Sequence, residues 1–317
     1  MSFNNIHFAA RFAASLSVAA LLLAAPVAFA ADNTPQEGRG KAVITVVKGQ
    51  ELPGGISQQA LQLKVNGKDA SVTGLTPLRG PQSTVEMVVL IDDGARASLG
   101  TQMNDMAKFI QNQQPDVKIA LAYMINGRAA LAGPLTTDHA AAARELHLPM
   151  PGTPGISASP YFCLSDLAKN WPSTDSSARR EVVMVSDGVD YYDLRYDPED
   201  PYVLAAIEDS VRAHLIVYSI YWRNAGRFDR TGYASYDGQN LLLEVTQATG
   251  GNSYWEGIGN PVDLEPYFAD IDQRLDNQYE LDFIAQAGNK PQMETLKLKL
   301  SAPAKIVAPQ QVYVGGE

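Results

Sequence analysis

Two apolar runs in this chain each begin at a glutamate and end in an aspartate near a glycine. The first covers residues 86–94 (EMVVLIDDG) and the second covers residues 181–188 (EVVMVSDG). Continuous runs of Val, Ile, Leu and Met are typical of strands that are buried on both faces, as in a parallel sheet. Open α/β sheets place their ligands at the carboxyl ends of such strands. The pattern therefore predicts a parallel sheet with Asp92 and Asp187 at its functional edge.

Between about residues 85 and 276, apolar runs alternate with segments of helical periodicity. Met103, Met106 and Ile110 recur at helical spacing, and Asp200 before Pro201 is typical of a helix N-cap followed by its first turn. Further strands are predicted at 117–124, 214–222 and 252–255, and helices at 103–110, 138–146, 161–171, 201–211, 241–248 and 262–276. This alternation predicts an α/β fold with a doubly wound, mostly parallel sheet flanked by helices.

The segments on either side of this region read as strands of a different kind. Residues 61–65 (LQLKV) alternate apolar with polar side chains, and Asn66 and Gly67 form a strong hairpin signal. Other strands are predicted at 42–47, 278–284, 296–300 and 306–314. We expect these strands to pack together as a small β unit. The expected organisation is a signal peptide over 1–30, a flexible leader over 31–40, an N-terminal β segment over 41–84, the α/β domain over 85–276 and a C-terminal β segment over 277–317.

The first 30 residues have the pattern of an export signal. Arg11 is their only charged residue, an apolar segment follows at 16–25, and Ala28, Phe29 and Ala30 match the small-x-small cleavage pattern. The apolar segment is too short for a good membrane span; an uncleaved N-terminal anchor is the alternative interpretation. We expect an exported protein, periplasmic or secreted after cleavage near Ala30, with no integral membrane span.

Composition excludes several classes of function. The formal net charge of −10 at pH 7 argues against binding to nucleic acid or to an anionic membrane surface. The single cysteine, Cys163, cannot form an internal disulfide and stands in an apolar context, which indicates a buried, inert thiol. No histidine has metal-ligand spacing, and no nucleophile elbow or phosphate loop occurs. We therefore expect a protein that is not an enzyme.

The order of these segments resembles that of the von Willebrand factor A (VWA) domain, and in particular that of exported bacterial VWFA-related proteins. The resemblance is carried by the N-terminal β segment, the two Asp-ending strands, the helix, Gly-Gly and strand at 241–255, and the Tyr-containing β tail at 278–283. It implies a VWA-like, Rossmann-like sheet. It also implies a metal-ion-dependent adhesion site, which binds Mg²⁺ or a similar cation through Asp-x-Ser-x-Ser, a later Thr and a later Asp.

The residues of this chain depart from that metal-site pattern. Asp92 matches the first aspartate and Asp187 the later one, but Gly94 and Arg96 stand where the two serines are expected. Hard cations require oxygen ligands, so the resemblance implies a degenerate site. Arg96 carries a permanent charge that pairs well with carboxylates. Our hypothesis is that it replaces the cation against Asp92, Asp93 or Asp187.

The threonine position of the metal site falls in a loop with three candidates, Thr153, Ser157 and Ser159. Ser159 is preferred because it lies just before the helix that begins near residue 161. We expect no cofactor. The alternative is a weak Mg²⁺ or Ca²⁺ site formed by Asp92, Ser98, Ser159 and Asp187 with water.

The same edge of the sheet carries two aromatic loops. Residues 187–200 contain several acids and the tyrosines Tyr191, Tyr192 and Tyr196, and Trp222 opens a second loop after the next strand. Exposed aromatic residues are enriched at interfaces, although a solvated loop is the alternative interpretation. The predicted partner-binding rim is Asp93, Tyr191, Tyr192, Tyr196 and Trp222.

These observations predict an exported, VWA-like module that binds a protein partner at the carboxyl edge of its sheet. Two alternatives stay open: an adhesion module with a divergent, working cation site, and an envelope scaffold without a defined ligand site. The sequence does not specify the oligomeric state.

Overall fold

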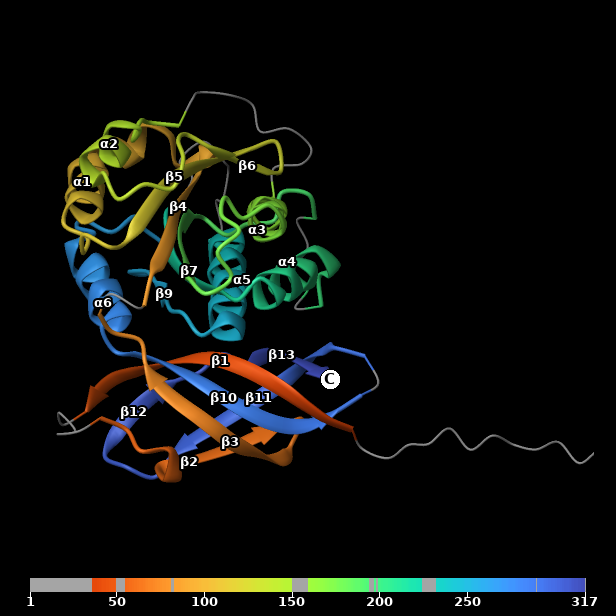
Figure 1. Ribbon diagram of the computed structural model, residues 1–317. Helices are drawn as coiled ribbons and strands as arrows, with labels where there is room; N and C mark the ends of the chain where they lie inside the picture. The colour runs from red at the N-terminus through yellow and green to blue at the C-terminus, as the bar shows by residue number, and fades with distance from the viewer. Residues whose placement is uncertain are drawn as a thin grey trace, which may run out of the picture. The chain divides into compact units, whose positions relative to one another are not determined.

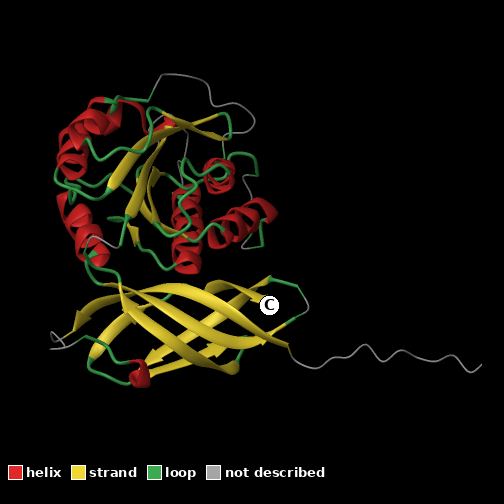
Figure 2. Ribbon diagram, viewed as in Figure 1, coloured by secondary structure: helices red, strands yellow, loops and turns green. Residues whose placement is uncertain are grey.

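The computed structural model describes a mixed α/β fold with two sheets, shown in Figures 1 and 2. The described residues are 36–49, 55–80, 83–149, 159–193, 197, 199–223, 232–288 and 290–316. The predicted signal peptide lies outside them. None of the helices in this part of the chain is long and apolar enough to span a membrane.

The first sheet has six strands in the order β6-β5-β4-β7-β8-β9. Its strands are β4 (Val85–Asp92), β5 (Lys118–Ile125), β6 (Arg128–Leu131), β7 (Arg179–Ser186), β8 (Leu215–Tyr221) and β9 (Ser253–Tyr254). All neighbours pair in parallel except β6, which returns antiparallel to β5. Every residue of β4 and β8 is buried, which confirms the mostly parallel sheet that the apolar runs predicted.

Helices cover both faces of this sheet (Figure 2). They are α1 (Met103–Gln111), α2 (His139–Arg144), α3 (Pro160–Lys169), α4 (Pro201–Arg212), α5 (Tyr233–Thr249) and α6 (Glu265–Leu275), and a 3-10 segment, η2 (Asp93–Gln102), follows β4. Met87, Val89 and Ile91 of β4 pack in one apolar cluster with α1 and α6. Val88 and Leu90 point to the other face and pack with α3, α4 and α5. Strand alternation thus divides the domain into two cores.

Local sequence explains where several of these helices begin. Asp200 caps α4, since its Oδ1 accepts hydrogen bonds from the backbone N–H groups of Tyr202 (2.7 Å) and Val203 (3.2 Å). The start of α5 differs from the prediction, because the helix begins at Tyr233 and not near Leu241. Its first turns bury small or polar side chains such as Ser235, which give no apolar periodicity to read.

The second sheet is antiparallel and closes into a barrel. Its strands are β1 (Gln36–Gly49), β2 (Leu61–Val65), β3 (Lys68–Pro77), β10 (Gln278–Ala287), β11 (Gln292–Leu300), β12 (Ala304–Val307) and β13 (Gln311–Gly316), with a short 3-10 helix, η1 (Gln58–Ala60), before β2. The order β10-β3-β2-β11-β13-β1 is closed by pairing of β1 with β10, and β12 pairs with the far end of β1. The N- and C-terminal segments therefore build one β unit, as expected.

Two details of the β unit correct the prediction. β1 begins at Gln36, inside the segment 31–40 that was expected to be a flexible leader. The glycines there serve close packing, because a Cβ atom on Gly40 would lie 2.3 Å from the Phe283 ring. The final strand predicted at 306–314 is two strands, β12 and β13. Pro309 lies between them and cannot donate a hydrogen bond to a sheet ladder.

Each of the two apolar runs begins at a fully buried glutamate. Glu86 is satisfied, because it accepts hydrogen bonds from Trp171 Nε1 (2.9 Å) and from Lys118 Nζ (3.2 Å). Glu181 has no hydrogen-bond partner of good geometry among the described residues. Burial raises the pKa of Glu181 from 4.5 to about 8, and the charge of Arg179 offsets this only in part.

Glu181 makes folding stability depend on pH. The folded-state pKa lies above the unfolded value, so between about pH 5 and about pH 8 the folded chain keeps a proton that the unfolded chain releases. Stability therefore falls as pH rises through this window. Glu181→Gln should remove this contribution and leave the protein more stable than wild type at about pH 8, as measured by urea unfolding across the window.

Glu86→Gln is the matched control for this prediction. It removes the ion pair with Lys118, so it should lower the free energy of unfolding at both ends of the pH range. A Glu181→Gln protein that is no more stable than wild type at about pH 8 would contradict the assignment.

Candidate functional site

The carboxyl ends of β4 and β7 meet at one edge of the parallel sheet. Asp92 is the last residue of β4, and Asp187 directly follows Ser186, the last residue of β7. Both aspartates are buried, with 6% and 4% of their surface exposed. The two strand ends are joined directly, because Ser186 Oγ donates a 2.6 Å hydrogen bond to Asp92 Oδ2.

Ser186 belongs to this candidate site and was not predicted from the sequence. Its hydroxyl also accepts a hydrogen bond from the backbone N–H of Gly188 at 3.1 Å, so it links β4, β7 and the following loop. The sequence signal that could have identified it is a serine at the end of the second apolar run, directly before Asp187. In the structure this serine provides the proton that Asp92 needs as a buried acceptor.

The carboxylate of Asp187 is satisfied on both oxygens. Its Oδ1 accepts from the Val189 backbone N–H (3.1 Å), and its Oδ2 accepts from the Tyr191 hydroxyl (2.8 Å). Tyr191 was predicted to face a partner, and the structure places its hydroxyl on Asp187. The backbone here is held closely by α5, because a Cβ atom on Gly238 would lie 2.1 Å from the Asp187 carbonyl oxygen.

Ser159 and Asp190 belong to the segments next to Asp187. Ser159 is the N-cap of α3, and its Oγ accepts from the Tyr161 backbone N–H at 3.3 Å. Burial raises the pKa of Asp190, while hydrogen bonds from Tyr192 and Ser159 act in the opposite direction. Asp190 Oδ1 accepts from the Tyr192 backbone N–H at 2.8 Å, but its Oδ2 has no hydrogen-bond partner of good geometry among the described residues.

The structure places Trp222 in the core, so its predicted contact with a partner is wrong. It is only 2% exposed, because the chain continues the line of β8 and the ring enters the apolar cluster on one face of the sheet. Its Nε1 donates to Ser98 Oγ at 3.0 Å, and Ser98 in turn donates to the Ala95 carbonyl at 2.8 Å. The hydroxyl of Ser98, a candidate cation ligand, therefore already takes part in two hydrogen bonds.

Some predicted residues cannot be placed. The side chains of Asp93 and Arg96 lie outside the described part of the structure, although their backbone belongs to η2. Tyr196, Thr153 and Ser157 also lie outside the described residues. The substitution of Arg96 for a cation therefore stays a prediction.

The carboxylates at this edge accept hydrogen bonds from protein donors. Within them, no group of three or more His, Cys, Asp or Glu side chains is arranged to hold a metal ion. Ser186 and Tyr191 bring hydroxyl protons to the carboxylate oxygens that a cation would need. A cation would compete with both hydroxyl protons for these oxygens.

Aromatic side chains gather beside the strand-end aspartates. Phe162 from α3, Tyr192 from the loop after β7 and Tyr202 from α4 form a cluster of edge-on rings, with centroids 4.9–5.3 Å apart. α3 and α4 lie side by side in Figure 1, which brings these rings together. Tyr192 is 48% exposed. Tyr192 was predicted to belong to the partner-binding rim, and that role stays a prediction; Phe162 and Tyr202 are its unpredicted neighbours.

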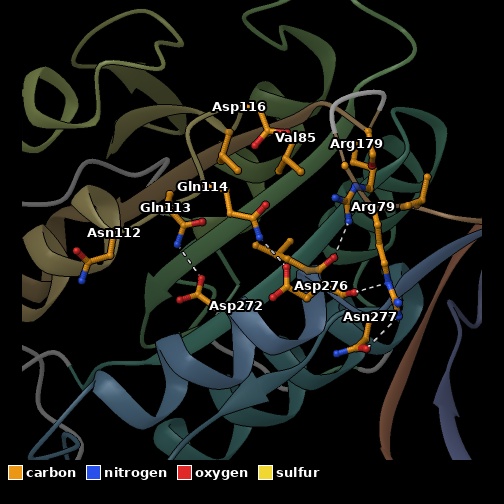
Figure 3. A pocket seen from close by; sticks show the side chains of 15 residues that line it. Arg79, Val85, Asn112, Gln113, Gln114, Asp116, Arg179, Asp272, Asp276 and Asn277 are labelled. Carbon is orange, nitrogen blue, oxygen red and sulfur yellow. Dashed lines mark hydrogen bonds between the residues drawn. The ribbon is translucent and has the colours of Figure 1, made fainter. Parts of the chain in front are cut away.

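The opposite edge of the sheet has a polar cavity of about 650 Å³ (Figure 3). Its polar side chains largely pair with one another. Gln113 donates to Asp272 and Gln114 donates to Asp276, each at 2.7 Å, and Arg79 donates to Asn277 at 3.3 Å. These pairs join α6 to the segments that precede β4 and β5, so the cavity is explained by packing.

No family model matches this chain, and no curated protein is similar to it. Several solved structures are similar in fold. A von Willebrand factor type A protein from Catenulispora acidiphila is 12% identical, with a TM-score of 0.40, over 88% of this chain and 74% of that one. BatB from Bacteroides thetaiotaomicron is 13% identical, with a TM-score of 0.43, over 60% of this chain and 97% of that one.

The vWF domain of the type V pili tip protein Mfa5 from Porphyromonas gingivalis is 14% identical, with a TM-score of 0.43, over 61% of this chain and 95% of that one. Similarity at this level says nothing about a ligand or a partner. The α/β domain that the sequence indicated is confirmed, with a mostly parallel sheet and an aspartate at the end of β4 and directly after β7.

Ser186→Ala should destabilise the domain. It leaves the buried Asp92 carboxylate without the Ser186 donor, which costs about 1–3 kcal/mol. Ser210→Ala is the control, because the Ser210 hydroxyl is buried in α4 without a partner among the described residues, and its loss should be neutral or stabilising. Urea unfolding measures both. Equal stability of the two variants would contradict the role given to Ser186.

Proposed function

We propose that this chain is an exported, non-enzymatic protein-binding module whose partner binds at the carboxyl edge of the parallel sheet, without a bound cation. One observation carries the proposal: the strand-end aspartates accept hydrogen bonds from protein donors, Asp92 from Ser186 and Asp187 from Val189 and Tyr191. A site built in this way is stable without a metal, because its buried acceptors are already paired.

The absence of catalytic chemistry in the sequence supports a binding role. Asp92 and Asp187 accept hydrogen bonds from internal donors, which orient both carboxylates within the protein. Arg96 keeps its proposed place as the cation surrogate. Export follows from the pattern of residues 1–30.

Exposed aromatic side chains mark the surface that a partner would cover. Tyr192 stands at the surface in the cluster with Phe162 and Tyr202, and Tyr and Phe are enriched in the cores of interfaces. Further apolar exposure occurs at the start of α5 and in the segment between β9 and α6, at Tyr233, Tyr236, Trp255 and Val262. The interface therefore centres on Tyr192 and extends along this edge.

Calorimetric titration with Mg²⁺ and with Mn²⁺ tests the cation. We expect no binding heat from wild type, because Ser186 and Tyr191 occupy the carboxylate oxygens. Tyr191→Phe frees Asp187 Oδ2 and serves as the variant most able to regain a weak site. Micromolar binding by wild type that is lost in Asp187→Ala would overturn the cation-free proposal and favour the adhesion module with a working metal site.

Capture of a partner from an envelope extract tests the surface. A Tyr192→Ser, Tyr202→Ser double variant should retain about tenfold less partner than wild type, as expected for aromatic residues at the centre of an interface. Leu131→Ser, which changes an exposed apolar residue on the edge strand β6, should capture normally. Capture should persist in EDTA. Equal capture by the double variant would favour the scaffold interpretation.

A further inference from the structure

The segments that build the β unit have the opposite charge from the α/β domain. Residues 36–80 and 277–317 contain ten Lys or Arg residues and seven Asp or Glu residues, a formal net charge of +3. Residues 81–276 contain 14 basic and 27 acidic residues, a formal net charge of −13. The β unit is therefore a basic part of an acidic chain, and such an uneven distribution favours the binding of anionic partners at the basic part.

Part of this positive charge lines a groove in the wall of the barrel. The groove has a volume of about 660 Å³ and is lined by residues of η1, β2, β3 and β11. It forms where β3 leaves β2, since these strands pair only from Val65 and Lys68 to Leu63 and Ala70, and β3 then pairs with β10. The Gln58 side chain spans the gap, because its Nε2 donates to the Val72 carbonyl. The strand pairing therefore fixes the position of the groove.

Three lysines line this groove, and two of them have no anionic partner. Lys64 of β2 forms an ion pair with Asp69 at 3.3 Å, but the Asp69 side chain is 89% exposed, so the pair contributes little. Lys297 and Lys299 of β11 are exposed and take part in no ion pair among the described residues. The groove therefore has an excess of positive charge.

The strand register holds two of these lysines against each other. Lys297 lies directly opposite Lys64 in the antiparallel pairing of β11 with β2, which brings their Cβ atoms to about 5 Å from each other. Like charges at opposite positions destabilise a sheet. Lys299 lies two residues further along the same face of β11. An anionic group bound in the groove would offset this repulsion.

The other side chains of the groove suit a peptide. Gln59 and Gln62 line it beside the lysines, and each amide offers both donors and an acceptor to the N–H and C=O groups of a peptide backbone. Leu61 and Val72 add apolar atoms to the lining. None of the described residues that line the groove is aromatic, so it offers no ring on which a nucleic-acid base could stack.

We propose that this lysine-lined groove binds an acidic polypeptide segment of another protein, whose Asp or Glu carboxylates contact the lysines and whose peptide groups contact the glutamines. Charge complementarity with the basic β unit sets the sign of the partner. The inference goes beyond the proposed function, because it assigns a second binding surface to a different sheet from the one that ends at Asp92.

Two fluorescent decapeptides of equal length test the groove, one rich in aspartate and glutamate and the other with lysine at those positions. Binding to the whole protein is measured by anisotropy at low salt. We expect the acidic peptide to bind, to weaken as salt rises, and to bind about tenfold more weakly to the double variant Lys297→Gln, Lys299→Gln. In urea this variant should be at least as stable as wild type, because it removes the repulsion between Lys297 and Lys64.

The matched control is Lys290→Gln, Lys305→Gln, which removes the same charge from two exposed positions of the β unit that do not line the groove. It should leave binding of the acidic peptide within about twofold of wild type. Equal loss in the control would overturn the inference, because it would indicate attraction by net charge alone. Binding of the lysine peptide in place of the acidic one, or of neither peptide, would also overturn it.

The double variant Tyr192→Ser, Tyr202→Ser separates this inference from the proposed function. It should bind the acidic peptide as wild type does, because its changes lie in the α/β domain. Loss of acidic-peptide binding in this variant would overturn the groove and leave the proposed function standing. A wild-type dimer in sedimentation that Lys297→Gln, Lys299→Gln abolishes would overturn the choice of another protein in favour of a second copy of this chain.

Discussion

The parallel pairing of β4 with β7 is the constraint on which the rest of the structure depends. Both strands are buried on both faces, so helices must cover each side of the sheet. The backbone N–H and C=O groups of the strands must therefore form their hydrogen bonds within the sheet. Polar groups enter only at the strand ends. At one end Glu86 is paired with Trp171 and Lys118, while Glu181 is held protonated by burial. At the other end Ser186 donates to Asp92 and joins the two strands through their side chains.

The strand-end chemistry supports the proposal that this edge is stable without a metal. Two carboxylates brought together in a buried site repel each other and need either a cation or donors. Here the donors are the hydroxyls of Ser186 and Tyr191, together with backbone N–H groups of the tight loop. Close contact between Gly238 and the Asp187 carbonyl holds that loop against α5. The edge therefore has a defined shape, and its remaining negative charge lies in the loop that follows.

The β unit shows how far pattern reasoning extends. Alternating positions predicted most of its strands, because each has one buried and one exposed face. Alternation could not predict that the barrel closes, because closure depends on pairing between β1 and β10, which are far apart in the sequence. The glycines at the start of β1 were interpreted as a leader, whereas packing against Phe283 requires them. Pro309 separates β12 from β13, a break that the proline itself could have predicted.

The sequence by itself determined the mostly parallel sheet, the helices that cover it and the edge at which Asp92 and Asp187 meet. These follow from hydrophobic period and cap residues, which act over a few neighbours. Only the tertiary structure decided the state of that edge. It brought the Ser186 hydroxyl onto Asp92, turned Tyr191 inward to Asp187, buried Trp222 and assembled Phe162, Tyr192 and Tyr202 from three separate elements. Such contacts join residues far apart in the chain, and they depend on packing geometry that no local pattern records.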